Sequence, residues 1–223
     1  MSATIIIARD ISTGRIFHID DVDKNEGASF ECCECRQKLS PVKTEARGKD
    51  WHFRHLQTAD IAKCRSTALH DFAVQVVMEN AVISISKKLQ IAYSVPRKEV
   101  TLFGKRSDVA VKYENEDVHF EIFVTHDLDK EKIDIYKVNK VKCVRIDLSE
   151  PSLLTASPEK IKETVLNQYK NKTVVYWQDE ILKPYEATQS DFSFKHVLIL
   201  IGAFIGLRFL YNHFFKPKRR NLR

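Results

Sequence analysis

The sequence predicts a mixed α+β or α/β fold in which a mixed sheet is flanked by helices. A small cysteine-rich β module is expected before this sheet, and a hydrophobic helix is expected near the C-terminus. Three observations support the prediction. Apolar residues recur with a helical period over residues 67–89. Short strand-like segments follow between residues 91 and 147, interrupted by one charged helical segment. Three of the five cysteines lie within residues 32–35, ahead of the helix.

The composition is that of a folded globular protein. Hydrophobic residues make up 43% and charged residues 30% of the 223 residues, which excludes an intrinsically disordered chain. The net charge is +6, but five positive charges lie in the last eight residues, so the rest of the chain is almost neutral. Overall charge is therefore a poor indicator of nucleic-acid binding. No apolar stretch follows a basic start, so we expect a cytoplasmic protein.

The expected elements begin with a β-hairpin, since residues 4–8 and 15–19 are strand-like and flank turn residues at 12–14. A long helix over residues 67–89, capped by Ser66 or Thr67, follows the cysteine-rich segment. We then expect strands at 91–95, 98–103, 107–113, 118–124, 142–147 and 173–177, with helices at 129–140 and from Ser157 onward. The expected division is 1–66 for the hairpin and metal module, 67–182 for the main domain, 183–195 for a linker, 196–215 for a hydrophobic helix and 216–223 for a basic tail.

Cysteine and histidine residues between positions 32 and 64 have the spacing of a metal site. Cys32 and Cys35 form a C-x-x-C pair, and His52, His55 and Cys64 follow within thirty residues. Two sulfurs from such a loop and a second pair from a distant segment complete the four ligands of a tetrahedral zinc ion. We predict zinc at Cys32, Cys35, His55 and Cys64, with His52 as the alternative histidine. The competing interpretation is a set of unrelated buried thiols with a core histidine.

Two acidic residues lie on neighbouring expected strands. Asp108 follows Arg106 and Ser107 in one strand, and Glu121 lies in the next. Carboxylates that face each other across a hairpin can share a divalent cation that activates water and stabilises a phosphate. Such pairs are also common as solvated surface residues, so the pattern alone leaves both interpretations open.

In this order of motifs the chain resembles the competence protein CoiA-like family, whose members join a zinc-ribbon-like segment to a PD-(D/E)xK nuclease fold. The resemblance covers about residues 1–180 and is carried by the hairpin, Cys32-x-x-Cys35, His52 to His55, Cys64, Leu69-His70, Arg106-x-Asp108-Val109 and Glu121-Ile122. It implies a restriction-endonuclease-like fold that hydrolyses DNA. It also implies a catalytic Mg²⁺ or Mn²⁺ ion at Asp108 and Glu121, with His70, Glu79 and Arg106 as auxiliary residues.

The third position of the nuclease motif departs from the family pattern. The family carries a lysine or glutamine two residues after the glutamate, whereas this chain has Phe123. Lys132, on the helix expected after the strand, is our candidate for the missing amine; the competing interpretation is a solvated helix lysine. Six basic residues against two acidic ones between positions 130 and 145 favour a phosphate backbone at the same place. The alternative to a nuclease is an inactive nucleic-acid-binding or membrane-tethered interaction protein.

The C-terminal segment is both hydrophobic and basic. The mostly apolar stretch within residues 196–215 reaches the lower limit for crossing a bilayer, but Arg208 would cost about 2.5–3.5 kcal/mol at its centre. The basic tail favours the cytoplasmic side of the membrane, and the nuclease domain is expected there too. A single span would place the two on opposite sides, so only one of them could be cytoplasmic. An anchor, a helix in the membrane plane, and a buried helix followed by a nucleic-acid-binding tail are the open interpretations.

Overall fold

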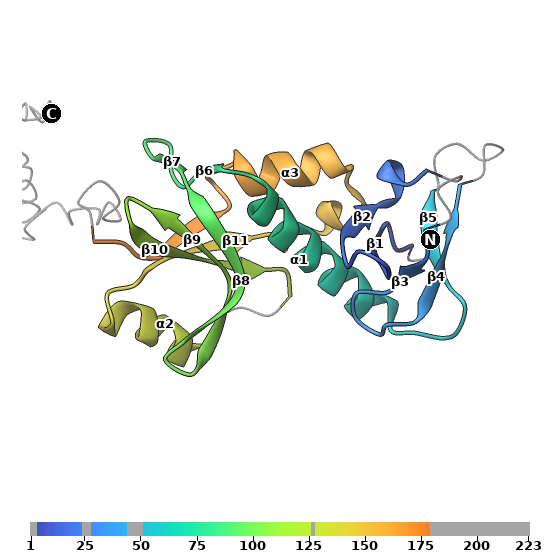
Figure 1. Cartoon of the computed structure of the whole chain (residues 1–223), viewed down its shortest axis with the longest axis horizontal. Coiled ribbons are helices and arrows are strands. Elements are labelled where there is room, and N and C mark those ends of the chain that lie inside the picture. Colours follow the sequence, from blue (N-terminus) through green and yellow to red (C-terminus); the bar gives the residue numbers. More distant parts are fainter. Residues whose placement is uncertain (1–3, 24–27, 44–50, 126–127, 179–223) are drawn as a thin grey trace, which may run out of the picture. The chain divides into compact units, whose positions relative to one another are not determined.

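Two five-stranded sheets, one two-stranded sheet and three α-helices form the part of the chain that the computed structural model describes, residues 4–23, 28–43, 51–125 and 128–178 (Figure 1). The expected mixed α+β fold is confirmed at this level. The expected linker, hydrophobic helix and basic tail, at 183–223, lie outside the described residues. Within the described ranges, no helix has the length and apolar character needed to cross a membrane.

The first sheet is antiparallel throughout and contains the predicted N-terminal hairpin. Its spatial order is β2-β1-β3-β4-β5. The hairpin turn is fixed by Asp10, whose Oδ1 accepts hydrogen bonds from the backbone N–H groups of Ser12 and Thr13, both at 2.8 Å. The short η1 (Ile19–Asp21) follows β2. The strands are β1 (Ile7–Asp10), β2 (Ile16–His18), β3 (Phe30–Glu31), β4 (Lys38–Val42) and β5 (His52–His55).

The long helix α1 (Ile61–Glu79) begins six residues before the expected start and ends ten residues before the expected end. Its N-cap is Asp60, whose carboxylate accepts a hydrogen bond from the backbone N–H of Lys63 at 3.2 Å. The helix was expected to continue beyond Glu79 because apolar residues recur there. Two of these residues, Ile83 and Ile85, are buried, but Ile83 lies in the strand β6 (Val82–Ser84), which pairs with β7 (Gln90–Ala92). The expected boundary between residues 66 and 67 falls inside α1.

The second sheet has the order β12-β11-β10-β9-β8 and is antiparallel except between β10 and β11. These two strands are parallel because α2 (Lys130–Val138) carries the chain from the end of one to the start of the other. The η3 helix (Pro151–Thr155) and α3 (Pro158–Leu166) lie between β11 and β12. The strands are β8 (Ser94–Leu102), β9 (Lys105–Tyr113), β10 (Glu116–Phe123), β11 (Lys142–Asp147) and β12 (Lys172–Tyr176).

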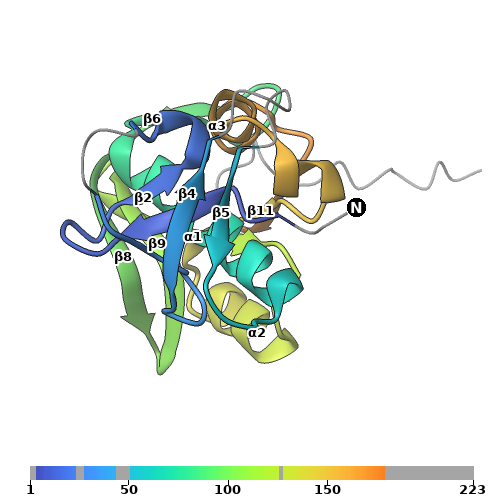
Figure 2. The same ribbon diagram turned by 90° about the vertical axis from the view of Figure 1, so that its right-hand side faces the viewer.

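Helix α1 contacts strands of both five-stranded sheets, and the two regions belong to one structural unit that spans residues 1–182 (Figures 1 and 2). Its apolar side shares a core with the second sheet, including Leu69, Phe72, Phe120 and Ile146. A second, smaller core lies around Phe30 and Phe53 in the first sheet, and it includes the helix residue Cys64. One helix therefore positions side chains at both the cysteine cluster and the acidic strands.

Candidate functional site

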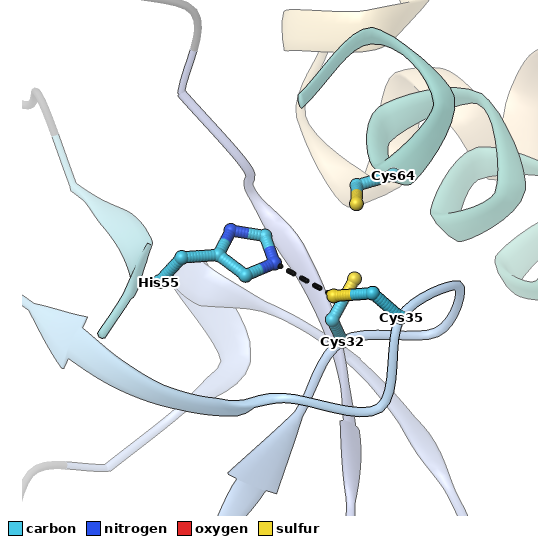
Figure 3. Close-up of side chains that lie close together, drawn as sticks. All are labelled: Cys32, Cys35, His55 and Cys64. Carbon is cyan, nitrogen blue, oxygen red and sulfur yellow. Dashed lines mark hydrogen bonds between the residues drawn. The ribbon is translucent and has the colours of Figure 1, made fainter. Parts of the chain in front are cut away.

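Cys32, Cys35, His55 and Cys64 converge on one point (Figure 3). One ligand atom from each residue lies within 4.8 Å of those of the other three, and the Cys35 Sγ is 3.3 Å from the His55 Nε2. Sulfur and nitrogen ligands of a tetrahedral zinc ion, each about 2.0–2.3 Å from the metal, lie roughly 3.5–3.8 Å apart. The four predicted residues therefore form a cluster that can hold a metal ion such as zinc.

Local backbone geometry brings the four residues together. The backbone carbonyl of Cys32 accepts a hydrogen bond from the Arg36 N–H at 3.1 Å, and Arg36 turns the chain back with a φ of 60°. Strand β4 then pairs with β5, which ends at His55. Cys64 lies in the first turn of α1, where burial, followed by the neighbouring Cys32 thiol, raises the pKa of its own thiol to about 12. Ligands that are far apart in sequence are thus fixed by one turn, one strand pair and one helix start.

The neighbouring histidine and cysteine do not join the cluster. His52 lies at the other end of β5 and is not among the grouped ligands. Cys33 points into the core that α1 shares with the second sheet, and burial raises the pKa of its thiol to about 12. Cys32 belongs instead to the smaller core around Phe30 and Phe53, so the turn after β3 directs the two adjacent cysteines into different cores.

The predicted carboxylates line one cleft of about 390 Å³. In the antiparallel register Val109 lies opposite Phe120, and Asp108 and Glu121 are the next residue of each strand. The Oδ2 of Asp108 accepts a hydrogen bond from the Ile122 N–H at 2.7 Å, so this side chain leans across to β10. The two acids therefore lie side by side at the end of the hairpin.

Glu121 is held in a buried polar environment, with only 3% of its surface exposed. The Nζ of Lys132 lies 2.6 Å from its Oε2, and the Tyr136 hydroxyl donates a hydrogen bond to its Oε1. Burial, followed by the nearby negative charge of Asp108, raises the pKa of Glu121 to about 7 in spite of these two partners. A second positive charge between the carboxylates would relieve this destabilisation.

His70 links Asp108 to the first sheet. Its Nε2 is 3.3 Å from the Asp108 Oδ2, its Nδ1 is 3.5 Å from Asp71 Oδ1, and Asp71 Oδ2 forms a 2.8 Å ion pair with Arg9 of β1. Burial opposes the charged form of His70, but hydrogen bonds to Asp108 and Asp71 outweigh it and raise the pKa to about 9. Burial also opposes ionisation of Asp108, yet His70 and the Ile122 N–H keep its pKa below the usual value. An alternating series of charges therefore extends from β1 to the cleft.

Lys132 and Phe123 both line the cleft, from different elements. Lys132 lies in the first turn of α2, and its amine reaches Glu121 from there. Phe123 is the last residue of β10, and the guanidinium carbon of Arg145 lies 5.0 Å from the centre of its ring. An amine is therefore near the carboxylates although the residue two positions after Glu121 is aromatic.

Two of the auxiliary residues are not among those that line the cleft. Glu79 forms an exposed ion pair with Arg15 at 3.1 Å, and Arg106 pairs with Glu99 at 3.3 Å. Glu79 follows His70 by nine residues, which at about 100° per residue places it on the opposite side of α1. Arg106 lies toward the exposed β8–β9 turn. Of the predicted auxiliary residues, His70 alone lines the cleft.

Part of the cleft wall consists of residues that were not predicted from the sequence. Lys63, Ser66 and Thr67 line it from α1, and Arg145, predicted only as a member of the basic stretch, lines it from β11. Lys63, Thr67 and His70 are spaced by four and three residues and so share one helix face, but this spacing is visible only when the helix begins at Ile61. The basic stretch predicted between positions 130 and 145 does not form one patch, because Lys142 is buried while only Lys132 and Arg145 line the cleft.

No known family model matches the chain, and neither a search of curated proteins nor a search of solved structures finds a match.

Proposed function

We propose that this protein is a metal-dependent nuclease that hydrolyses DNA phosphodiester bonds, with a CoiA-like, restriction-endonuclease-like fold. The observation that carries the proposal is the meeting of Asp108, Glu121 and Lys132 in one cleft. Apart from the two-stranded sheet β6–β7, which follows α1, the order is a helix (α1), three antiparallel strands (β8 to β10), a helix (α2) and a parallel strand (β11). This order supports the fold, since the two acids and the amine all come from it.

Asp108 and Glu121 would hold the catalytic Mg²⁺ or Mn²⁺, because hard divalent cations prefer carboxylate oxygens. The fit is favourable because Glu121 is buried beside a second carboxylate and gains from a compensating positive charge. The chemistry that such an ion supplies is positive charge, which favours ionisation of water and stabilises the additional charge on a phosphate under attack.

Lys132 and Arg145 are the protein groups that we assign to the phosphate. In hydrolysis the water oxygen forms a bond to phosphorus, the bond from phosphorus to one sugar oxygen breaks, and that oxygen takes up a proton. The Lys132 ammonium, 2.6 Å from Glu121, is near enough to orient the water and to offset the developing negative charge. Arg145 borders the same cleft and offers a guanidinium to the phosphate oxygens.

The cysteine–histidine cluster would hold a structural zinc ion. Four protein ligands complete tetrahedral coordination and leave no open position for a substrate. A closed site of this kind serves structure, because its metal–ligand bonds stabilise the fold. The ion would join the β3–β4 turn, β5 and the start of α1, which carries Lys63, Thr67 and His70 into the cleft. Zinc would therefore act on the nuclease site through the position of the helix.

The test is a cleavage assay with Mg²⁺ or Mn²⁺ on linear, nicked and single-stranded DNA. Asp108→Ala and Glu121→Ala are expected to abolish cleavage, whereas Asp134→Asn, which changes an exposed acid on α2, is expected to leave it unchanged. Thermal melting of all three variants verifies that the loss is not due to unfolding. Cleavage that persists in both alanine variants would refute the assignment.

The alternative function is nucleic-acid binding without cleavage. Phe123 favours it, because the motif amine is absent from that position and Lys132 has to replace it from another element. This alternative predicts DNA binding with no cleavage under any divalent metal. Membrane attachment through residues 196–215 belongs to the same alternative, and cell fractionation of the full chain against a chain ending at residue 195 tests it.

A further inference from the structure

The wall of the cleft beside Glu121 has an aromatic ring where the nuclease motif usually has an amine. Phe123 follows Glu121 by two residues in β10 and therefore lies on the same side of the strand. Arg145, opposite Glu121 in the parallel register of β11, lies over the Phe123 ring. Both side chains line the cleft and both are only partly buried. The Arg145 guanidinium is also held by Asp147 at 3.1 Å, which fixes this side of the pair.

Such a pair has the properties of a stacking platform. Bases stack on aromatic rings and on guanidinium planes without regard to sequence, and this contact contributes about 1–3 kcal/mol per base. In the core a phenylalanine is usually covered on all sides, but Phe123 lies at the end of its strand among the polar residues of the cleft. Because Lys132 brings an amine to Glu121 from α2, the position two residues after Glu121 is available for a different contact with the substrate.

The opposite wall is polar. Lys63, Ser66 and Thr67 come from the first two turns of α1. Lys63 and Thr67 are held by Glu34, a residue within the Cys32–Cys35 loop; the Thr67 hydroxyl donates to Glu34 at 2.8 Å. One side of the cleft thus offers flat, apolar and cationic surface, while the other offers an ammonium and hydroxyl groups suited to a sugar–phosphate backbone.

The dimensions of the cleft fit a single nucleotide unit better than a duplex. Its volume of about 390 Å³ lies in the range of sites for one small ligand, and Glu121 is almost fully buried within it. In a duplex the bases are stacked inside the helix, so a base can reach an aromatic ring only when it is unpaired. A phosphate on a flexible single strand can also enter a narrow cleft that a stiff double helix cannot.

We infer that the cleft binds an unpaired DNA strand, with one base stacked on Phe123 and the adjacent phosphate directed toward Asp108 and Glu121. This inference rests on the nuclease proposal and adds its substrate class. Single-stranded DNA, flaps and frayed strand ends are substrates of this class, and fully paired DNA is not.

The first test measures binding without cleavage. Dissociation constants are determined by fluorescence anisotropy for a labelled single-stranded oligonucleotide and for the duplex of the same sequence, at one fixed salt concentration and without added divalent metal. The single strand is expected to bind at least about fivefold more tightly than the duplex, as the loss of one stacking contact predicts. Equal affinity, or tighter binding of the duplex, would overturn the inference.

The second test changes the ring. Phe123→Ala is expected to weaken binding of the single strand about 5- to 150-fold, which corresponds to one stacked base, and Phe123→Trp is expected to retain it. Tyr169→Ala, which removes a partly exposed aromatic residue that is not among those lining the cleft, is the matched control and should have no effect. Retained affinity in folded Phe123→Ala overturns the inference, and retention by the tryptophan variant separates stacking from misfolding.

The two proposals fail in different ways. If the single strand binds through Phe123 but no DNA is cut with Mg²⁺ or Mn²⁺, the binding inference stands and the nuclease proposal falls. If paired DNA is cut efficiently and Phe123→Ala cuts it equally well, the nuclease proposal stands and the substrate class is wrong. When both are correct, Phe123→Ala raises KM for single-stranded DNA more than it lowers kcat.

Discussion

Replacing Cys64 by alanine should have a far larger effect than replacing Cys33 by alanine. Both side chains are buried, with 1% and 4% of their surface exposed, and they lie in the same region of the chain. Cys64 is one of the four clustered ligands, whereas Cys33 is packed among apolar residues. The two substitutions remove the same atoms, so the difference between them isolates the contribution of metal binding.

The expected magnitudes follow from these environments. Cys33→Ala removes one core sulfur and should cost about 1 kcal/mol, which lowers the Tm by roughly 2–4 °C for a unit of this size. A structural zinc site contributes about 10–16 kcal/mol, as much as the whole stability of a typical domain. Cys64→Ala should therefore unfold the first sheet and fray the start of α1.

The assay combines metal analysis with thermal unfolding. We expect about one equivalent of zinc in the unaltered protein and in Cys33→Ala, and almost none in Cys64→Ala. A chelator should destabilise the first two proteins and leave the third unchanged. Stoichiometric zinc in Cys64→Ala, or an equal loss of stability in both variants, would refute the reasoning.

Three further predictions concern stability. Burial lowers the pKa of His18, whose Nε2 lies 3.1 Å from the carbonyl oxygen of Ala156. The unfolded chain therefore binds more protons than the folded chain, and the free energy of unfolding should fall as the pH decreases below about 6.5. His18→Asn should reduce this pH dependence in urea titrations. Asp60→Ala removes the N-cap of α1 and should cost about 1 kcal/mol, measured by chemical unfolding, whereas an unchanged midpoint would contradict its capping role. Tyr136→Phe removes the hydroxyl that donates to buried Glu121 and should cost about 1.5–3 kcal/mol in the same assay, and a neutral effect would show that this hydrogen bond does not stabilise the fold.

The second sheet was predictable where its strands have a clear local signal, but β8 contains Pro96 and is one strand where we expected two, at 91–95 and 98–103. Strands β9 and β10 are rich in β-branched and aromatic residues, and the charged segment before β11 has the spacing of a short helix. The strands around the cysteines were not predictable in the same way. Strand β3 has two residues and β4 contains Pro41, so neither has the alternation that identifies a strand, and the cluster with its core fixes them instead.

The extent of α1 shows why an apolar period alone misplaces a helix. The first turn of α1 contributes Lys63 to the cleft and Cys64 to the cysteine cluster, and these two residues interrupt the hydrophobic pattern there. At the other end, buried Ile83 and Ile85 extend the pattern into a strand. Tertiary contacts decide both ends, and they are not visible in a local sequence window.

The candidate site likewise contains residues that local sequence predicts and residues that depend on tertiary contacts. The four residues of the cysteine–histidine cluster were identified from sequence because C-x-x-C spacing constrains two of them locally and few other cysteines and histidines lie nearby. Arg145 was predicted only as one of the basic residues near the site, because its place directly beside Glu121 depends on the parallel pairing of β10 and β11, which no local pattern reveals. Residues that act together through strand pairing become apparent only once the sheet order is known.

The ion pair between Arg9 and Asp71 has a practical consequence for dissecting the protein. A shortened chain that starts within α1 would lose the Arg9 guanidinium but keep the partly buried Asp71 carboxylate next to His70. It would also expose the side of the helix that now covers β1 and β2. The N-terminal third is therefore not an independent domain, and the two five-stranded sheets have to be expressed, purified and redesigned together.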